Sequence, residues 1–136
     1  MIETERLVIE PPPMGKVQVY DIERVIANEG DFQNRISAID VPGAGGACHR
    51  YQVSKGRNPL CSIKFQEGGI QDFGVNGCQN EDLLAIVIDR LECFQAGPYS
   101  CEENREALRL TAEALSWLRY RTSDRVSRGV EGTSKK

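Results

Sequence analysis

The chain has 136 residues, enough for one domain with its own core, although oligomerisation could supply much of the burial. Its net charge of -3 argues against non-specific binding to DNA or RNA, which rests on a basic surface, whereas a small anionic ligand needs only a local basic pocket. No apolar run approaches membrane-spanning length, and residues 1–13 lack the pattern of a secretory signal, so we expect a cytoplasmic protein.

The cysteines do not indicate a disulfide framework or a metal site. There are five of them, an odd number without paired spacing. No two lie close enough for a typical zinc motif, and the single histidine, His49, merely adjoins Cys48. We therefore expect free thiols, with no metal and no cofactor.

The sequence of the N-terminal half predicts an arm followed by a small sheet. Residues 1–15 contain Pro11-Pro12-Pro13, which favours extended polyproline geometry, so we expect a flexible arm there. From residue 16 to 73, short extended runs are broken by glycine and proline, and their connections are too short for helical crossovers. About four antiparallel strands are predicted, within residues 16–25, 35–41, 48–53 and 60–65.

Glycine-rich connections divide these elements. The segment 42–46 reads Pro-Gly-Ala-Gly-Gly, which suggests a phosphate cradle but lacks the lysine and following helix of a P-loop; glycine is also ordinary turn chemistry. Gly68-Gly69 should end the last strand. Asn76-Gly77 should then form a tight turn with positive backbone angles.

A first helix is predicted from Asn80, whose side chain can cap the free amides of the first turn. Its apolar residues cover most of the circumference, which indicates burial on several sides. They are Leu83, Leu84, Ile86, Val87, Ile88, Leu91 and Phe94. Gly97, in a left-handed conformation, and Pro98 should end the helix.

A second helix should begin with a capping box of Ser100 and Glu103 and run to about Arg128 before Gly129. It would be roughly 42 Å long against about 24 Å for the first, so it must project beyond it. The glycine-containing tail that follows should be disordered. The predicted fold class is α+β, with an arm (1–15), a β region (16–73) and a linker, helical hairpin and tail (74–136) in one compact domain.

The projecting part of the second helix carries a basic face. Trp117, Arg121, Arg125 and Arg128 are spaced four, four and three residues apart, which places them on one side. Guanidinium groups beside an indole suit phosphates and a base. A solvated basic face, with Asp124 pairing Arg121 or Arg128, explains the same pattern.

The hairpin also carries a series of short motifs, namely Gly74-Val75-Asn76-Gly77, LAIVIDRL at 84–91, Phe94-Gln95, Gly97-Pro98-Tyr99, Glu103-Asn104, Ala114-Leu115, Trp117-Leu118, Arg121-Thr122, Asp124-Arg125 and RGVEGT at 128–133. Together these motifs resemble the first family of phage Thoeris anti-defence proteins, whose hairpin is shared with phage proteins that counter CBASS immunity. The sheet region resembles the family more loosely.

The resemblance implies a sponge rather than an enzyme. Members of the family sequester glycocyclic ADP-ribose, a signal made by bacterial TIR proteins on infection, without cleaving it, and so block Thoeris immunity. Some are hexamers that also hold CBASS cyclic di- and trinucleotides at separate sites. The implied location is the cytoplasm of the infected host, with no DNA, RNA or membrane partner.

The resemblance assigns ligand contacts to side chains at both ends of the hairpin, namely Phe94, Asn104, Arg121, Arg125, Arg128 and Thr133. Phe94 would stack on the adenine and Asn104 would hydrogen-bond the ligand. Arg121 and Arg125 would take the pyrophosphate and neighbouring oxygens. The roles of Arg128 and Thr133 are an extrapolation from the matching tail.

Residue spacing adds a constraint of its own. Asn104 and Arg121 are about 25 Å apart along one helix, so a small ligand cannot touch both within one chain. Two antiparallel hairpins would bring the aromatic end of one to the arginine end of the other, and a twofold axis would make two equal pockets. An antiparallel dimer at least is therefore predicted, and a hexamer is implied by the resemblance.

Two other functions remain open. A nucleotide-hydrolysing enzyme acting on the same signal has candidate bases in Asp89, Glu92, Asp124 and His49, but no base, nucleophile and orienting partner fall into a recognisable arrangement. A nucleic-acid-binding regulator could use Trp117 and the arginine row in a groove, although the acidic total charge disfavours it.

Overall fold

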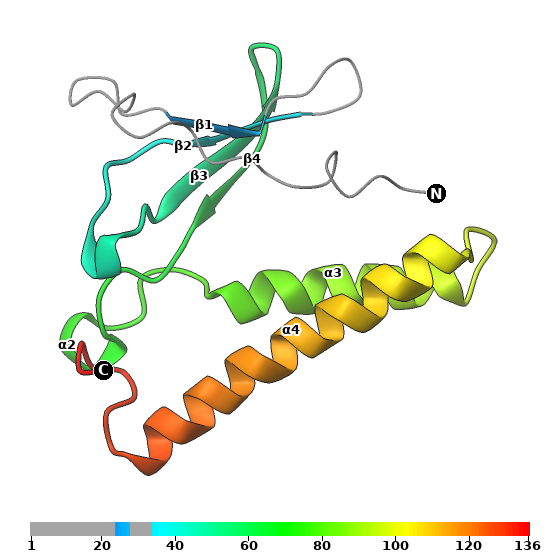
Figure 1. The fold of residues 1–136 in the computed structure, drawn as a ribbon. Helices are drawn as coiled ribbons and strands as arrows, with labels where there is room; N and C mark the ends of the chain where they lie inside the picture. Colours follow the sequence, from blue (N-terminus) through cyan, green and yellow to red (C-terminus); the bar gives the residue numbers. More distant parts are fainter. Residues whose placement is uncertain (1–23, 28–33) are drawn as a thin grey trace. The chain divides into compact units, whose positions relative to one another are not determined.

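The computed structural model describes residues 24–27 and 34–136 (Figure 1). The chain divides into two compact units, Met1–Gly68 and Gly69–Lys136. The expected arm at 1–15 and most of the run 16–25 lie outside the described residues. The division of the chain into arm, β region and hairpin segment stays a prediction.

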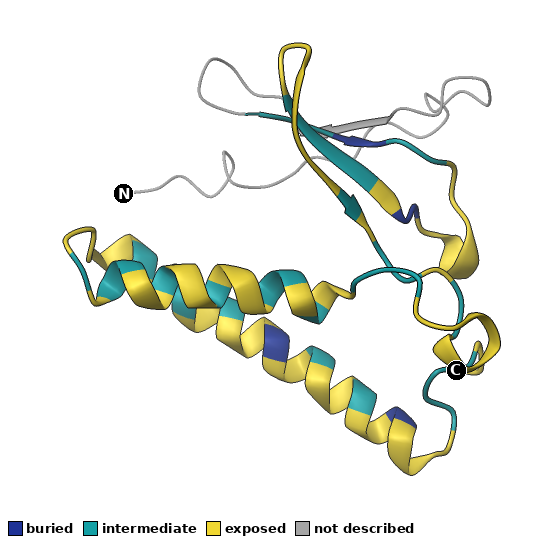
Figure 2. Cartoon of the chain, turned by 180° about the vertical axis from the view of Figure 1, so that it is seen from behind, coloured by how far each residue is buried: buried dark blue, intermediate teal, exposed yellow. Residues whose placement is uncertain are grey.

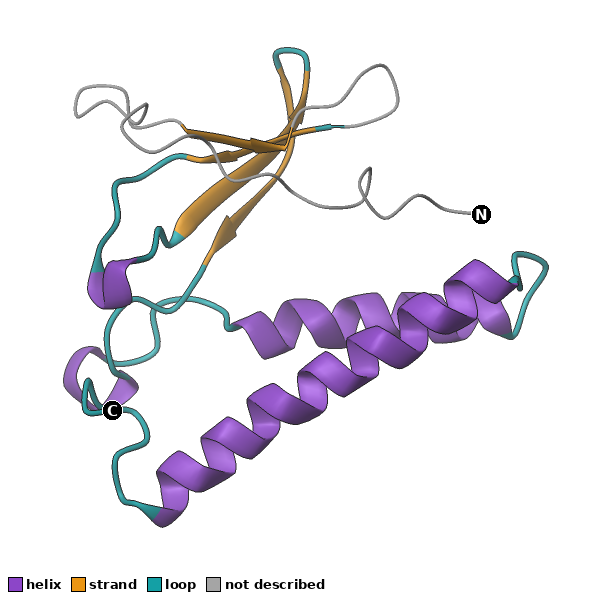
Figure 3. Cartoon of the chain, viewed as in Figure 1, coloured by secondary structure: helices purple, strands orange, loops and turns teal. Residues whose placement is uncertain are grey.

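An antiparallel sheet forms the first unit (Figure 3). Its four strands follow the order β1-β2-β3-β4, with bounds β1 (Arg24–Ala27), β2 (Arg35–Ala38), β3 (Arg50–Lys55) and β4 (Asn58–Lys64). Each strand pairs antiparallel with the next one along the chain, as short connections require. The antiparallel sheet predicted from the sequence is confirmed.

The glycine-rich connection between β2 and β3 is a turn with its own hydrogen bonds. Gly43 N donates to Ala47 O at 2.9 Å, which encloses the short 3-10 helix η1 (Ala44–Gly46). The carboxylate of Asp40 accepts from the backbone N of His49 at 3.0 Å and fixes the end of the loop. Turn geometry therefore accounts for the glycines of this segment.

The second unit contains the predicted helical hairpin. Its helices are α2 (Ile70–Phe73), α3 (Asn80–Gln95) and α4 (Glu102–Ser127). The 26-residue α4 packs along the 16-residue α3 and extends past its start, as predicted (Figure 1). Thr122 Oγ1 donates to Glu81 Oε2 at 3.5 Å near the point where the two helices part. The helix α2 is too short to show a helical period, and the sequence does not predict it.

Both long helices start one residue away from the predicted cap. Gln79 rather than Asn80 precedes α3, and its backbone N donates to Asp82 Oδ2 at 2.8 Å. Cys101 rather than Ser100 precedes α4. In each case the cap is the residue whose backbone is extended at the boundary, which residue type alone does not determine.

Two predictions about left-handed glycines are wrong. Among the described residues, positive φ occurs at Gly74 (71°), which ends α2, and at six other glycines, but not at Gly97, Asn76 or Gly77. The cap of α3 is Ala96, with right-handed φ -84° and ψ -8°. Glycine permits a left-handed backbone at Gly74, Gly77 and Gly97, and the surrounding contacts decide where it is used.

The C-terminal tail is folded, which contradicts the expected disorder. Gly129 has φ 71° and follows α4, as predicted, but the chain then returns to α2. Gln71 N donates to Gly132 O at 2.8 Å, and Gln71 Nε2 donates to Glu131 O at 2.7 Å. A Cβ atom on Gly69 would lie 2.3 Å from Gly132 O, so glycine allows this close approach. The prediction of disorder rests on amino-acid composition alone, and composition does not reveal long-range contacts such as these.

Few side chains of the hairpin are buried within one chain (Figure 2). In α4 only Leu115 and Arg125 are buried, whereas α3 has no buried residue and Ile86 is 57% exposed. The expected burial of α3 on several sides is therefore not met inside one chain. Of the helices that the structure describes, none combines the length and apolarity needed to cross a membrane.

Candidate functional site

At the end of the hairpin where α3 and α4 are connected, two aromatic rings lie beside a cation and an amide. We call these four side chains the turn cluster; they are Arg90, Phe94, Tyr99 and Asn104. The rings of Phe94 and Tyr99 meet edge to face with centroids 5.8 Å apart, and Arg90 Cζ lies 5.2 Å from the Phe94 centroid. Asn104 Nδ2 donates to Tyr99 O at 3.2 Å, while Asn104 N donates to the thiol sulfur of Cys101 at 3.4 Å. Ring surface, a cation and an amide are thus held together at the turn.

Sequence reasoning places Phe94 and Asn104 at the same end of the hairpin, as the structure does, but misses Arg90 and Tyr99; the ligand contacts themselves stay a prediction. Arg90 precedes Phe94 by one helical turn, a spacing that puts both on one face of α3. Tyr99 lies in the connection and is 69% exposed. The spacing of Arg90 could have indicated its contact with Phe94, whereas the position of Tyr99 depends on how the connection folds.

The opposite end of α4 is organised around Arg125, which the tail encloses. Its guanidinium donates from Nε to Glu131 Oε1 at 2.9 Å and from Nη1 to Lys135 O at 2.7 Å. Nη2 donates to Val130 O at 2.8 Å and to Thr133 O at 3.0 Å. We call Arg125 and residues 130–135 the tail cluster. Arg125, which is 6% exposed as a whole residue, holds the C-terminal segment by these hydrogen bonds.

The other predicted arginines differ from Arg125 in their surroundings. Arg128 Nε pairs with Asp124 Oδ2 at 3.0 Å, and its Nη1 donates to Lys136 O at 2.6 Å. One of the two pairings foreseen for a solvated basic face is therefore present. Arg121 is exposed and acts on Glu131 through its charge.

Two arginines, Arg125 and Arg121, lower the pKa of the Glu131 carboxyl group. The hydrogen bond from Arg125 holds the pKa of Glu131 below its ordinary value, and the charge of Arg121 lowers it further. Thr133 lies within the same tail, where its N donates to Val130 O at 3.1 Å and its Oγ1 accepts from Lys135 N at 3.3 Å. An ionised carboxylate thus stands among cations that suit an anionic ligand.

A single chain does not bring all the predicted site residues together. Phe94 and Asn104 belong to the turn cluster, whereas Arg121, Arg125, Arg128 and Thr133 lie at the other end of α4. The separation of Asn104 and Arg121 on the continuous helix is about 25 Å. Each end alone therefore holds only part of the predicted site: ring surface and an amide at the turn, and guanidinium groups at the other end.

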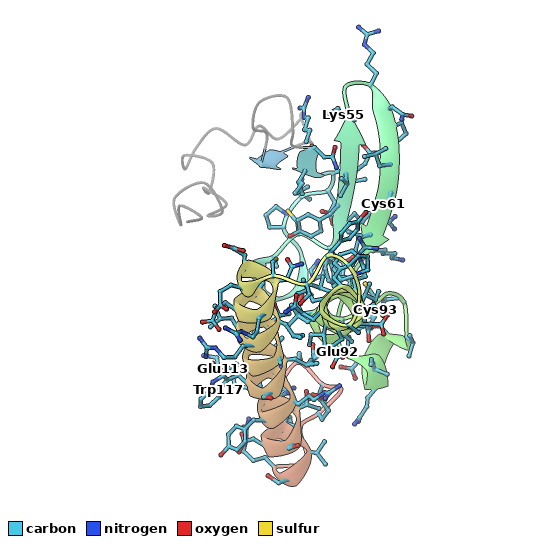
Figure 4. All side chains as sticks on the ribbon, turned by 90° about the vertical axis from the view of Figure 1, so that its right-hand side faces the viewer. Lys55, Cys61, Glu92, Cys93, Glu113 and Trp117 are labelled. Carbon is cyan, nitrogen blue, oxygen red and sulfur yellow. The ribbon has the colours of Figure 1, made fainter. Side chains whose placement is uncertain are left out.

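An exposed apolar stripe also runs along α4. Leu110, Trp117 and Tyr120 are 54%, 66% and 68% exposed, and the rings of Trp117 and Tyr120 meet edge to face. Figure 4 shows Glu113 and Trp117 projecting from the side of α4 that faces away from α3. These side chains are not part of the packing between the two helices.

No group of three or more histidine, cysteine or acidic side chains within residues 34–136 is placed to hold a metal ion. His49, one of the candidate bases, is buried, with Nδ1 3.8 Å from Glu67 Oε2. That pair lies in the β unit, whereas the nucleotide-suited side chains lie in the hairpin unit.

Comparison with known proteins adds two findings. A family profile described as the Acb2/Tad1 hairpin domain matches residues 58–123, which include the whole turn cluster and Arg121. A protein of Bacillus phage SBSphiJ7 named Thoeris anti-defense 1 is 44% identical over 94 residues, covering 69% of this chain. The aligned part is 66% of that relative, just under two thirds of its length.

Proposed function

This chain belongs to the Thoeris anti-defense 1 family of phage proteins, and we propose that it blocks Thoeris immunity by sequestering glycocyclic ADP-ribose without cleaving it. The family match carries the proposal, because it includes the turn cluster that suits a purine. The protein would act in the cytoplasm of the infected bacterium, where TIR proteins make the signal. Binding of this kind uses no cofactor and no catalytic residue.

The proposed contacts follow the chemistry of each end. Phe94 stacks on the adenine, and Asn104 hydrogen-bonds the ligand from the same cluster. Arg121 and Arg125 take the pyrophosphate, since a guanidinium donates two parallel hydrogen bonds to phosphate oxygens. Arg128 and Thr133 complete the phosphate end. In support, Arg121 is exposed at the end of α4 where the basic side chains gather.

The proposed site requires two chains, because its halves are about 25 Å apart on one helix. An antiparallel pair of hairpins would place the turn cluster of one chain beside the arginines of the other. The exposed side chains Ile86, Leu110 and Trp117 support such an assembly, because apolar surface of this kind is typical of interfaces. A hexamer, with CBASS cyclic di- or trinucleotides held at a separate site, extends the same proposal.

Sequestration and hydrolysis are separated by what happens to the ligand. The protein is incubated with glycocyclic ADP-ribose, freed of unbound ligand, denatured by heat, and the released material is analysed by chromatography. Recovery of intact ligand is the expected result. A new product would identify a nucleotide-hydrolysing enzyme instead.

The site assignment is tested by Phe94→Ala and Arg121→Ala. Each should reduce affinity by roughly 5- to 150-fold, the usual range for one stacked base or one charged contact, while the fold and oligomeric state remain unchanged. Calorimetry measures the affinity and native mass spectrometry the assembly. Phe73→Ala and Arg119→Ala are matched controls, because each removes an exposed side chain of the same type outside the turn cluster, the tail cluster and the apolar stripe. Wild-type affinity in either test variant would refute its assignment.

A further inference from the structure

The guanidinium of Arg125 is already occupied in the free chain. Four hydrogen bonds from its three nitrogens reach Val130 O, Glu131 Oε1, Thr133 O and Lys135 O. An arginine has five N–H groups, so only one remains for a ligand. A two-pronged contact between Arg125 and a pyrophosphate therefore needs one of these partners to leave.

The four partners are not equally free to leave. Three are main-chain carbonyls of the tail, which is also held by Gln71 through Gly132 O and Glu131 O. Moving those carbonyls would unfold the tail from α2. The fourth partner is the side chain of Glu131, which is 36% exposed, whereas that of Arg125 is only 8% exposed. Rotation of a side chain releases this contact without disturbing the backbone.

We infer that Glu131 is a specificity-determining residue that occupies the phosphate position on Arg125 in the free protein and is displaced by a sufficiently anionic ligand. This inference rests on the proposed function for the identity of the ligand. It adds a role for a side chain outside the six assigned contacts.

The exchange favours strongly anionic ligands for an electrostatic reason. With Glu131 in place, its single negative charge offsets part of the positive charge of Arg121 and Arg125. A pyrophosphate carries at least two negative charges and can engage both arginines, so it gains more than the carboxylate loses. An uncharged nucleoside offers no such compensation and leaves Glu131 where it is. The carboxylate thus selects for charge at the phosphate end.

The test uses Glu131→Gln in the full-length protein, with inorganic pyrophosphate, glycocyclic ADP-ribose and adenosine as probes. Glutamine keeps an oxygen that accepts from Arg125 Nε but removes the competing charge. Affinity for the two anionic probes should rise about 3- to 10-fold, the size of one partly exposed charged contact, and affinity for adenosine should not change. Glu106→Gln is the matched control, because it removes one charge and one arginine pair on α4, between Glu106 Oε2 and Arg109 Nε at 3.1 Å.

A second readout follows the contact itself. The NMR signal of Arg125 Nε–H should shift when pyrophosphate is added to the wild type, because its acceptor changes from carboxylate to phosphate. Three results would overturn the inference. Glu131→Gln could bind pyrophosphate no more tightly than the wild type, Glu106→Gln could show an equal gain, or neither the wild type nor Glu131→Gln could bind pyrophosphate. Failure of glycocyclic ADP-ribose alone to bind the wild type would refute the proposed function, and the pyrophosphate measurements would still decide the role of Glu131.

Discussion

The two ends of the hairpin are built in different ways. The turn cluster is assembled from residues 90–104, which are near neighbours in sequence, and Tyr99 within it is 69% exposed. The tail cluster is held against α2 by contacts such as Gln71 to Glu131, sixty residues apart, and its central Arg125 is 6% exposed. The turn cluster is therefore formed by local contacts and is exposed, and we call it the open end. The tail cluster is formed by long-range contacts around a buried arginine, and we call it the closed end.

This difference teaches how the two halves of a nucleotide site can be prepared. At the turn, Phe94 and Asn104 are held by their neighbours, so in the proposed site a base would meet side chains that are already in position. At the other end, the cation that should meet a phosphate is enclosed by the tail of its own chain. If Glu131 is displaced as inferred, binding there would include an exchange of partners, and the tail would be part of the site.

The largest expected effect comes from Arg125→Ala, which removes the centre of the closed end. Three carbonyls and the carboxylate of Glu131 would lose their donor, at a cost of about 2 to 4 kcal/mol in the free energy of unfolding. Chemical denaturation measures this value, and limited proteolysis reports release of the tail. Arg109→Ala is the control, because Arg109 pairs only with exposed carboxylates on its own helix. A stable, protease-resistant Arg125→Ala protein would show that the tail does not depend on this arginine.

The same contrast explains which features could be predicted from the sequence. Helical periodicity and strand alternation are local, so the antiparallel sheet, the hairpin and the projection of α4 are predicted correctly. Phe94 and Asn104 share an end for the same reason, because the connection between the helices is short. The caps at Gln79 and Cys101 escape prediction, since several neighbouring polar residues suit a helix start equally well.

The tail shows why the rest could not be predicted. A segment with two glycines and terminal lysines has the composition of a disordered end, and nothing within it indicates that its carbonyls face an arginine of α4. The need for glycine at Gly69 depends on the approach of Gly132, which is distant in sequence. Long-range contacts between polar backbone groups leave no periodic signal in either segment.

An intermediate loss in the free energy of unfolding is expected from Gly69→Ala, which tests how tightly the closed end is packed. The added Cβ would lie 2.3 Å from Gly132 O, so the backbone must shift, at a cost of about 1 to 3 kcal/mol. Hydrogen exchange at the Gln71 amide should accelerate as its bond to Gly132 weakens. Gly97→Ala is the matched change at the open end, where the new Cβ would lie 3.3 Å from Cys93 O. If the two variants lost equal stability, the closed end would not be the more tightly packed of the two.

The smallest expected effect is a dependence of stability on acid, which comes from the closed end. The pKa of Glu131 in the folded chain is below its ordinary value of 4.5, because Arg125 donates a hydrogen bond to the ionised form. A carboxyl with a lowered folded pKa stabilises the protein above its unfolded pKa, and this contribution is lost as pH falls through the folded value.

Partial exposure of Glu131 screens the effect, so it should be modest. The difference in unfolding free energy between the wild type and Glu131→Gln should therefore be constant near neutral pH and shrink as the pH falls below about 5. Glu103→Gln, in the first turn of α4 at the open end, provides the comparison. If the wild-type advantage over Glu131→Gln persisted unchanged to pH 3, the carboxylate would not contribute to closure through its charge.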